Sequence, residues 1–141
     1  VWHHIVDKQG TANECGRVLK KGGHTVIRTI GHAQLHQKVV FHYFPEIKQN
    51  QLNVYPSNEE FTEYFTKAGF REVNFHEYCE ERYQSVEEFV EIAKKKLWSM
   101  FRPITDEGLR MGVAELWKYK ADNEGAPVRN DELITLVVAC L

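Results

Sequence analysis

TANECGRVLKKGGHTVIRTI, residues 11–30, is the stretch that decides the fold. Thr11 and Glu14 have the spacing of a capping box, in which each side chain bonds to a backbone amide at a helix start. An apolar stripe follows at helical spacing, formed by Cys15, Val18 and Leu19. Two glycines then allow the positive φ of a helix end. Residues 24–30 are apolar and β-branched, which favours a strand. The stretch therefore predicts a helix, a glycine turn and a buried strand.

On either side of this unit the pattern is weaker. Residues 1–5 are apolar and aromatic and predict the end of a strand, followed by a loop over 7–10. Residues 32–44 have a roughly helical apolar pattern, which Pro45 ends because the residue before a proline is disfavoured in a helix. Residues 49–56 are mostly polar and predict a loop.

Two further capping boxes predict helices with clear starts. Ser57 and Glu60 open a helix over 57–69, whose apolar stripe comprises Phe61, Tyr64, Phe65 and Ala68. Ser85 and Glu88 open another, with a stripe of Val86, Phe89, Val90, Ala93 and Leu97. Between them, residues 72–79 alternate in the way of a strand.

The last part of the chain predicts one more helix and a central strand. Thr105 or Asp106 caps a helix that carries Leu109, Val113, Leu116 and Trp117. Residues 134–141 are apolar without interruption, the pattern of a strand buried on both faces. Strands that alternate with helices in this order predict an α/β layered sheet with inserted helices.

Composition excludes several classes of function. The chain has 141 residues, 43% of them hydrophobic, and this suits one domain with a packed core. A net charge of −2 argues against non-specific nucleic-acid binding. The three cysteines stand far apart and form no disulfide or zinc pattern, which favours a cytoplasmic protein. No apolar stretch is long enough to predict a membrane span.

In its motifs the chain resembles class I S-adenosylmethionine-dependent methyltransferases of the type 11/12 kind. HHIVD is similar to the segment after that family's fourth strand, and ECGRVLKKGGHTVIR to the next helix and the fifth strand. FTEYFTKAGFREVNF resembles the helix and the sixth strand, and LITLVVACL the seventh. Lys21 departs from the proline usual there. The resemblance implies strands four to seven of a Rossmann-like sheet, with residues 134–141 antiparallel between the strands at 24–30 and 72–79.

Two elements of the family are absent from these residues: the glycine-rich turn after the first strand and the acidic residue that holds the cofactor ribose. Both features carry nucleotide binding in related folds. We therefore expect the chain to be the C-terminal half of the fold and, by itself, to bind S-adenosylmethionine weakly and to be inactive. A domain cut before residue 1 would also leave an apolar sheet edge at 1–5, which predicts a homodimer through that edge.

Candidate site residues follow from the carboxyl ends of the strands, where open α/β sheets bind ligands. The resemblance assigns Trp2, His3 and His4 to the cofactor; alternatively, the histidines stabilise a turn that Asp7 caps. Other candidates, for contact with a small methyl acceptor, lie after the fifth strand and in the inserted segments. The inserted segment at about 84–126 would form a helical lid. The candidates are Arg28, His32, Tyr43, Phe44, Trp98 and Arg102. The alternatives are an ion pair for Arg28 and helix packing for the aromatic residues.

Other readings of the same residues remain open. His32 and His36 have a spacing known from metal sites, but no neighbouring motif completes one, so we expect no metal. No residue is assigned a catalytic role, because methyl transfer rests mostly on proximity. The alternative to a small-molecule methyltransferase portion is a non-catalytic α/β interaction module that lacks the cofactor site.

Overall fold

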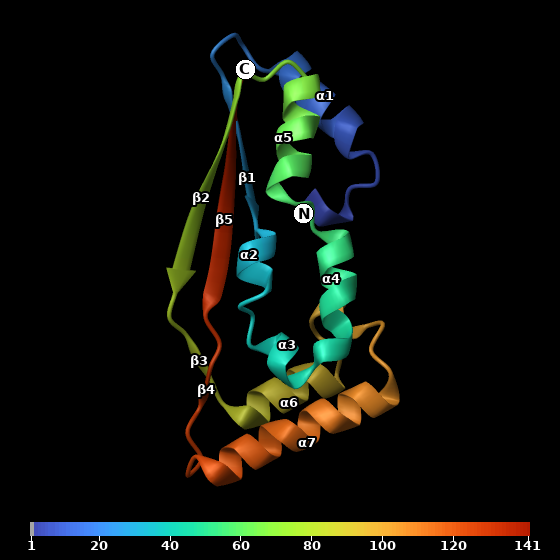
Figure 1. The fold of residues 1–141 in the computed structure, drawn as a ribbon, viewed down its shortest axis with the longest axis vertical. Helices are drawn as coiled ribbons and strands as arrows, with labels where there is room; N and C mark the ends of the chain where they lie inside the picture. Colours follow the sequence, from blue (N-terminus) through green and yellow to red (C-terminus); the bar gives the residue numbers. More distant parts are fainter. Residues whose placement is uncertain (1) are drawn as a thin grey trace. The chain divides into compact units, whose positions relative to one another are not determined.

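The computed structural model describes residues 2–141, which form two compact units (Figure 1). Unit 1 comprises the described residues up to 35, together with 52–78 and 133–141. Unit 2 comprises residues 36–51 and 79–132. The helical segment expected at about 84–126 belongs to unit 2, and its role as a lid stays a prediction.

Three strands form the sheet of unit 1: β1 (His24–Thr29), β2 (Glu72–Glu80) and β5 (Glu132–Cys140). Their order is β1-β5-β2, and β5 is antiparallel to β1, with Val26 opposite Val138. Figure 1 shows that β2 also runs opposite to β5. The predicted insertion of the last strand between the two others is therefore confirmed.

One face of β5 is buried and the other is half-buried. The buried face carries Leu133, Thr135, Val137 and Ala139, and the residues between them are partly exposed. Val137 and Ala139 pack in one cluster with Ala12, Phe61 and Phe65 from the helices. The expectation that β5 is buried on both faces is therefore wrong for the second face, because this cluster covers only one side of the strand.

Residues 2–5 form no strand. Trp2–His4 is a single 3₁₀ turn, η1, which packs through Trp2 against the aromatic rings of Phe61 and Phe65, at centroid distances of 5.6 Å. A strand was predicted because the segment is apolar, but its apolar side chains here bury themselves under a helix instead of joining the sheet. The predicted homodimer requires a strand at 1–5, and residues 2–5 do not form one. Self-association of the chain stays a prediction, which light scattering tests.

The first long helix, α1 (Lys8–Val18), begins one turn earlier than predicted. Asp7 caps it, because its Oδ1 accepts a hydrogen bond from the Gly10 amide at 2.7 Å. The predicted box of Thr11 and Glu14 is wrong: the Thr11 hydroxyl donates to the Asp7 carbonyl, and Glu14 pairs with Arg17. An aspartate four residues upstream is an equally good cap, and the polar residues that follow it are compatible with a helix.

The segment at 32–44 is not one helix. It contains α2 (His32–Leu35) and α3 (Val40–Tyr43), separated where the chain passes from unit 1 to unit 2. The break lets Leu35 and Val40 each bury themselves in a different unit. The predicted loop at 49–56 is also wrong, because the helical turn η2 (Pro45–Ile47) continues directly into α4 (Lys48–Val54).

The clearest helix prediction is confirmed in detail. In α5 (Asn58–Lys67) both hydrogen bonds of the capping box are present, between Ser57 and Glu60. Phe61 and Phe65 are fully buried beneath the helix. Phe65 also meets Phe70 edge-on, at a centroid distance of 4.9 Å, so the turn into β2 is packed as well.

Unit 2 is built on helices that pack around Phe44, with Phe89 and Phe101 as neighbours. Ser85 and Thr105 cap two of its helices, each accepting a hydrogen bond from the amide three residues later. For Ser85 this is one of the two bonds of the predicted capping box. The remaining elements of this unit are β3 (Tyr83–Gln84), α6 (Val86–Lys94), η3 (Ser99–Phe101), α7 (Asp106–Asp122) and β4 (Val128–Arg129).

Candidate functional site

A histidine with a defined ring tautomer lies at the carboxyl end of β1. His32 begins α2 directly after the strand, and its Nε2 lies 2.6 Å from the carbonyl oxygen of Tyr55. A carbonyl only accepts hydrogen bonds, so Nε2 must carry the proton. In the neutral ring the lone pair is then on Nδ1, which is available to accept a proton or a hydrogen bond.

The same tyrosine contacts the η1 turn. The His3 ring lies 4.3 Å from the Tyr55 ring and 4.0 Å from the His4 ring, measured between centroids. Tyr55 thus joins His3, a predicted cofactor residue, to His32, a predicted substrate residue. We call His3, His4, His32 and Tyr55 the histidine–tyrosine cluster. It brings together three separate segments of the chain, of which even His32 and Tyr55 are 23 positions apart in the sequence.

Burial and a neighbouring histidine keep His3 neutral. Partial burial disfavours its charged form, and the positive charge of His4 adds to the effect, so the pKa of His3 is lowered from 6.5 to about 4. At neutral pH the ring is therefore an uncharged aromatic surface beside Tyr55. Burial likewise raises the pKa of Tyr55, whose phenol stays protonated.

The lowered pKa of His3 predicts a loss of stability in mild acid. Between pH 6.5 and about 4 the unfolded chain takes up a proton at this residue and the folded chain does not, so stability falls as the pH falls through this window. In His3→Phe, which keeps a ring on Tyr55, the free energy of unfolding should depend less on pH. Urea unfolding at a series of pH values gives the free energy of unfolding of the original chain and of the variant. An equal change with pH in the two proteins would contradict the assignment of this pH dependence to His3.

A buried polar network holds the turn that carries His32. The Thr135 hydroxyl accepts from the Gly31 amide at 2.8 Å and donates to Gln34 Oε1 at 2.7 Å. The Gln34 amide group donates to the carbonyls of Tyr78 and Ile134, at 3.1 and 3.2 Å. Gln34 is 4% exposed and Thr135 is fully buried. This network ties α2 to both neighbouring strands and so fixes the start of the helix.

A carboxylate stands near the cluster at the start of α5. Hydrogen bonds from its own backbone amide and from Ser57 lower the pKa of Glu59, and the charge of His32 contributes. Sequence reasoning missed both Glu59 and Tyr55. Tyr55 precedes Pro56 and the helix cap, so the sequence indicates that it lies just before a helix. The sequence does not indicate its two histidine partners, because they come from distant segments.

Trp2 and Arg28, the other predicted site residues of unit 1, are not members of the cluster. Trp2 is 4% exposed, and no hydrogen-bond partner is present for its indole nitrogen among residues 2–141. Arg28 is paired across the sheet with Leu136 and alternates with Ile27, which faces the core, so Arg28 lies on the opposite face. Their binding roles stay predictions.

The predicted substrate residues of unit 2 belong largely to its core. Phe44 is fully buried and Tyr43 nearly so, and Tyr43 meets Phe89 and Tyr119 edge-on. Trp98 stacks on Phe101 at a centroid distance of 6.0 Å. Arg102 is exposed at the end of η3. Helix packing, the alternative that the aromatic pattern left open, accounts for these contacts, and a role in substrate binding stays a prediction.

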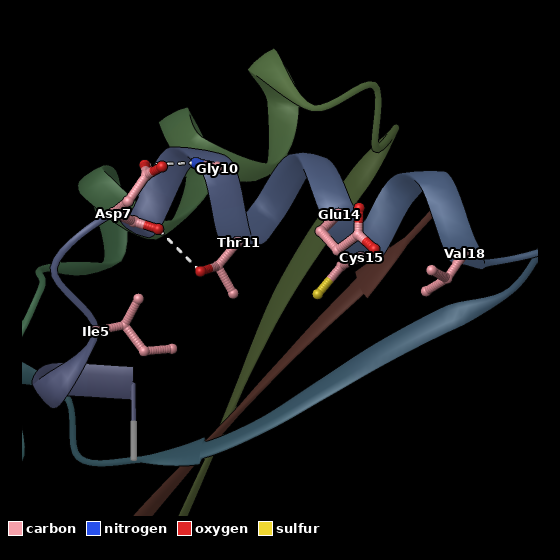
Figure 2. A pocket seen from close by; sticks show the side chains of 7 residues that line it. All are labelled: Ile5, Asp7, Gly10, Thr11, Glu14, Cys15 and Val18. Atoms are coloured by element: carbon pink, nitrogen blue, oxygen red, sulfur yellow. Dashed lines mark hydrogen bonds between the residues drawn. The ribbon is translucent and has the colours of Figure 1, made fainter.

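A groove of about 450 Å³ follows one flank of α1 (Figure 2). Ile5, Cys15 and Val18 supply its apolar lining, and Asp7 lies at its end, bonded to Gly10. None of the predicted site residues lines it. Across residues 2–141 no group of three or more His, Cys, Asp or Glu side chains is placed to hold a metal ion. In the same range no helix has the length and apolar character needed to cross a bilayer.

The fold resembles that of known methyltransferases. A putative methyltransferase from Bacillus halodurans is 17% identical, and the match covers 99% of this chain and 60% of that protein, with a TM-score of 0.50. Phosphoethanolamine N-methyltransferase 2 of Haemonchus contortus, solved with S-adenosylmethionine and in a second structure with S-adenosylhomocysteine, matches at 15–16% identity with TM-scores of 0.39–0.42. These matches cover 98–99% of this chain and 31% of that enzyme.

No protein-family model and no curated protein matches the chain. The chain spans 31–60% of the length of the solved structures above. The likeness is therefore one of fold. At that level it confirms the resemblance to a methyltransferase fold that the sequence motifs indicated.

Proposed function

We propose that the chain is the C-terminal portion of an S-adenosylmethionine-dependent methyltransferase that acts on a small-molecule acceptor. The observation that carries the proposal is the histidine–tyrosine cluster at the carboxyl end of β1, beside a sheet whose central strand is antiparallel to its neighbours. Open α/β sheets bind their ligands at that end. Strands five, six and seven of the methyltransferase sheet would correspond to β1, β2 and β5, and η1 to the segment that follows strand four.

The chemistry of the cluster suits this reaction. A neutral His3 ring beside Tyr55 forms an aromatic surface of the kind that attracts a cation such as a sulfonium. His32 can accept a proton or a hydrogen bond through Nδ1 while its other nitrogen is held by Tyr55. Catalysis would rest mainly on holding the methyl donor and acceptor in line.

By itself the chain should bind S-adenosylmethionine no more tightly than millimolar, on the order of 4 kcal/mol of binding free energy. The reason is that these residues contain no glycine-rich turn and no ribose-binding acid of the family's kind. Isothermal titration of the purified chain measures the affinity. A micromolar dissociation constant would contradict the expectation.

A chimera tests the proposed function itself. This chain would replace the matching 60% of the Bacillus halodurans protein, whose remaining residues would supply the rest of the fold. We expect the chimera to bind S-adenosylmethionine, and His3→Ala to weaken binding about tenfold through loss of the aromatic surface. His24→Ala, on exposed β1 outside the cluster, is the matched control. A folded chimera without binding would refute the proposal.

A further inference from the structure

A second groove, of about 640 Å³, lies between α5 and β2 within unit 1. Its floor is the ring of Phe75, which is partly buried against the hydrophobic core. Its wall is the exposed flank of α5, formed by Asn58, Glu59, Thr62, Glu63, Thr66 and Lys67. The groove therefore combines an apolar floor from a strand with a polar wall from a helix.

The strand beneath this groove is an edge of the sheet. In the order β1-β5-β2, β2 has a strand partner on one side only among the described residues. Along β2 the residues that face the helices alternate, and Val73 and Phe75 both pack against the core. An edge strand beside a helix groove is the arrangement in which extended peptides add a strand to a sheet.

The groove is acidic. Glu59 and Glu63 line it, and the Lys67 ammonium, which pairs with Glu63, is the one basic group in the lining. Glu77 adds a third carboxylate at the end of the groove, because a Cβ at Gly31 would lie 3.6 Å from Glu77 Oε1 and 3.7 Å from Asn58 Oδ1. Hydrogen bonds lower the pKa of Glu59, which is therefore ionised at neutral pH.

We propose that this groove binds an extended peptide segment of a partner protein in which a basic and an apolar residue stand two positions apart. The segment pairs with the free edge of β2 through its backbone. Every second side chain then faces the groove, so the apolar residue covers Phe75 and the basic residue two positions away lies near Glu59 and Glu77. The groove beside α1 offers no such match, since no residue of the edge strand β1 lines it.

The test uses the whole chain and an end-capped peptide with the repeat lysine-threonine-valine-threonine, which places lysine and valine on the same face of a strand, titrated by calorimetry. We expect binding that weakens about tenfold or more between low and physiological salt, because charged groups at the rim are screened. A peptide of the same composition with a central proline should not bind, because proline cannot complete the strand ladder. Absence of binding at low salt, or equal binding of the proline peptide, would overturn the proposal.

Variants assign the binding to this groove. Glu59→Gln combined with Glu77→Gln should raise the dissociation constant about tenfold, whereas Glu115→Gln, an exposed carboxylate of α7 in unit 2, should leave it unchanged. Amide spectra of each variant establish that the fold is kept. Equal affinity in the double variant would refute the site. Sedimentation tests for self-association. If the chain is a dimer and the added peptide dissociates it, the groove binds a second copy of the chain, and the proposal of a partner protein is overturned.

Discussion

Gly112→Ala is expected to destabilise unit 2 by about 3 kcal/mol, the upper part of the range for overpacking a buried site. A Cβ at this position would lie 2.2 Å from two ring carbons of Phe44 and 2.6 Å from the Tyr43 carbonyl oxygen. The Phe44 ring is fully buried between Phe89 and Phe101 and has no free space to move into. Fluorescence of Trp98 and Trp117 during urea unfolding follows this unit.

Gly108→Ala is the matched control, in the same helix, α7. Its Cβ would meet a carboxylate oxygen of Glu46, an exposed side chain that can rotate away at the loss of its two hydrogen bonds from Thr105. Alanine also favours a helix interior over glycine by about 1 kcal/mol. The two substitutions should therefore differ in effect by several-fold, and equal effects would mean that Phe44 yields more easily than its packing indicates.

The second large effect is expected from Gln34→Leu, which should destabilise unit 1 by about 2–3 kcal/mol. Leucine removes the acceptor for the Thr135 hydroxyl and the donor for the carbonyls of Tyr78 and Ile134. The Thr135 hydroxyl is buried and would be left without an acceptor, which costs more than the net value of the bond itself, and the two partly buried carbonyls would each lose a donor. The melting temperature and the free energy of unfolding measure the effect.

Two substitutions of Thr135 separate the network from simple packing. Thr135→Ser keeps the hydroxyl and should cost little more than the lost methyl group, whereas Thr135→Val removes the hydroxyl at nearly constant volume. If the network acts as a unit, the double variant of Thr135→Val and Gln34→Leu will lose less free energy of unfolding than the two single variants lose together. Full additivity would mean that the two residues stabilise the fold independently.

Features with local causes were predictable from the sequence. The helix at Ser57 and the helices capped by Ser85 and Thr105 have caps and apolar stripes within one or two turns, and all three helices occur. Two predicted members of the stripes, Leu97 and Trp117, are exposed instead of buried. The final strand was readable from its unbroken apolar run, and the glycine turn near Gly22 has the positive φ expected of it. The central position of the final strand was predicted from this apolar run together with the resemblance to a family.

Features that depend on tertiary packing were not predictable in this way. The apolar residues at 2–5 have the composition of a strand but are buried as a 3₁₀ turn against α5. The pattern at 32–44 fits one helix, yet its apolar side chains serve two separate cores. In α4 the polar composition predicts a loop, and the preceding proline turn starts a helix instead.

The candidate site shows the same division. His3 and His32 were identified separately, from their places after strands of the expected sheet. That both contact Tyr55 depends on a fold that brings residues 3, 32 and 55 together, which no local pattern contains. Glu59 escaped notice for the same reason, since in the sequence it is one of several acidic residues at a helix start.

The central place of β5 in the sheet has a consequence for the synthesis of the protein. β1 and β2 do not pair with each other, and both depend on a strand that the ribosome makes 50 residues or more after β2 is complete. Neither therefore has a sheet partner among the described residues while α6 and α7 are being made. The sheet of unit 1 therefore cannot form until residues 132–140 have left the exit tunnel, and until then the unit consists of loosely associated helices and strands with unpaired edges. During that interval the nascent chain is most in need of a chaperone.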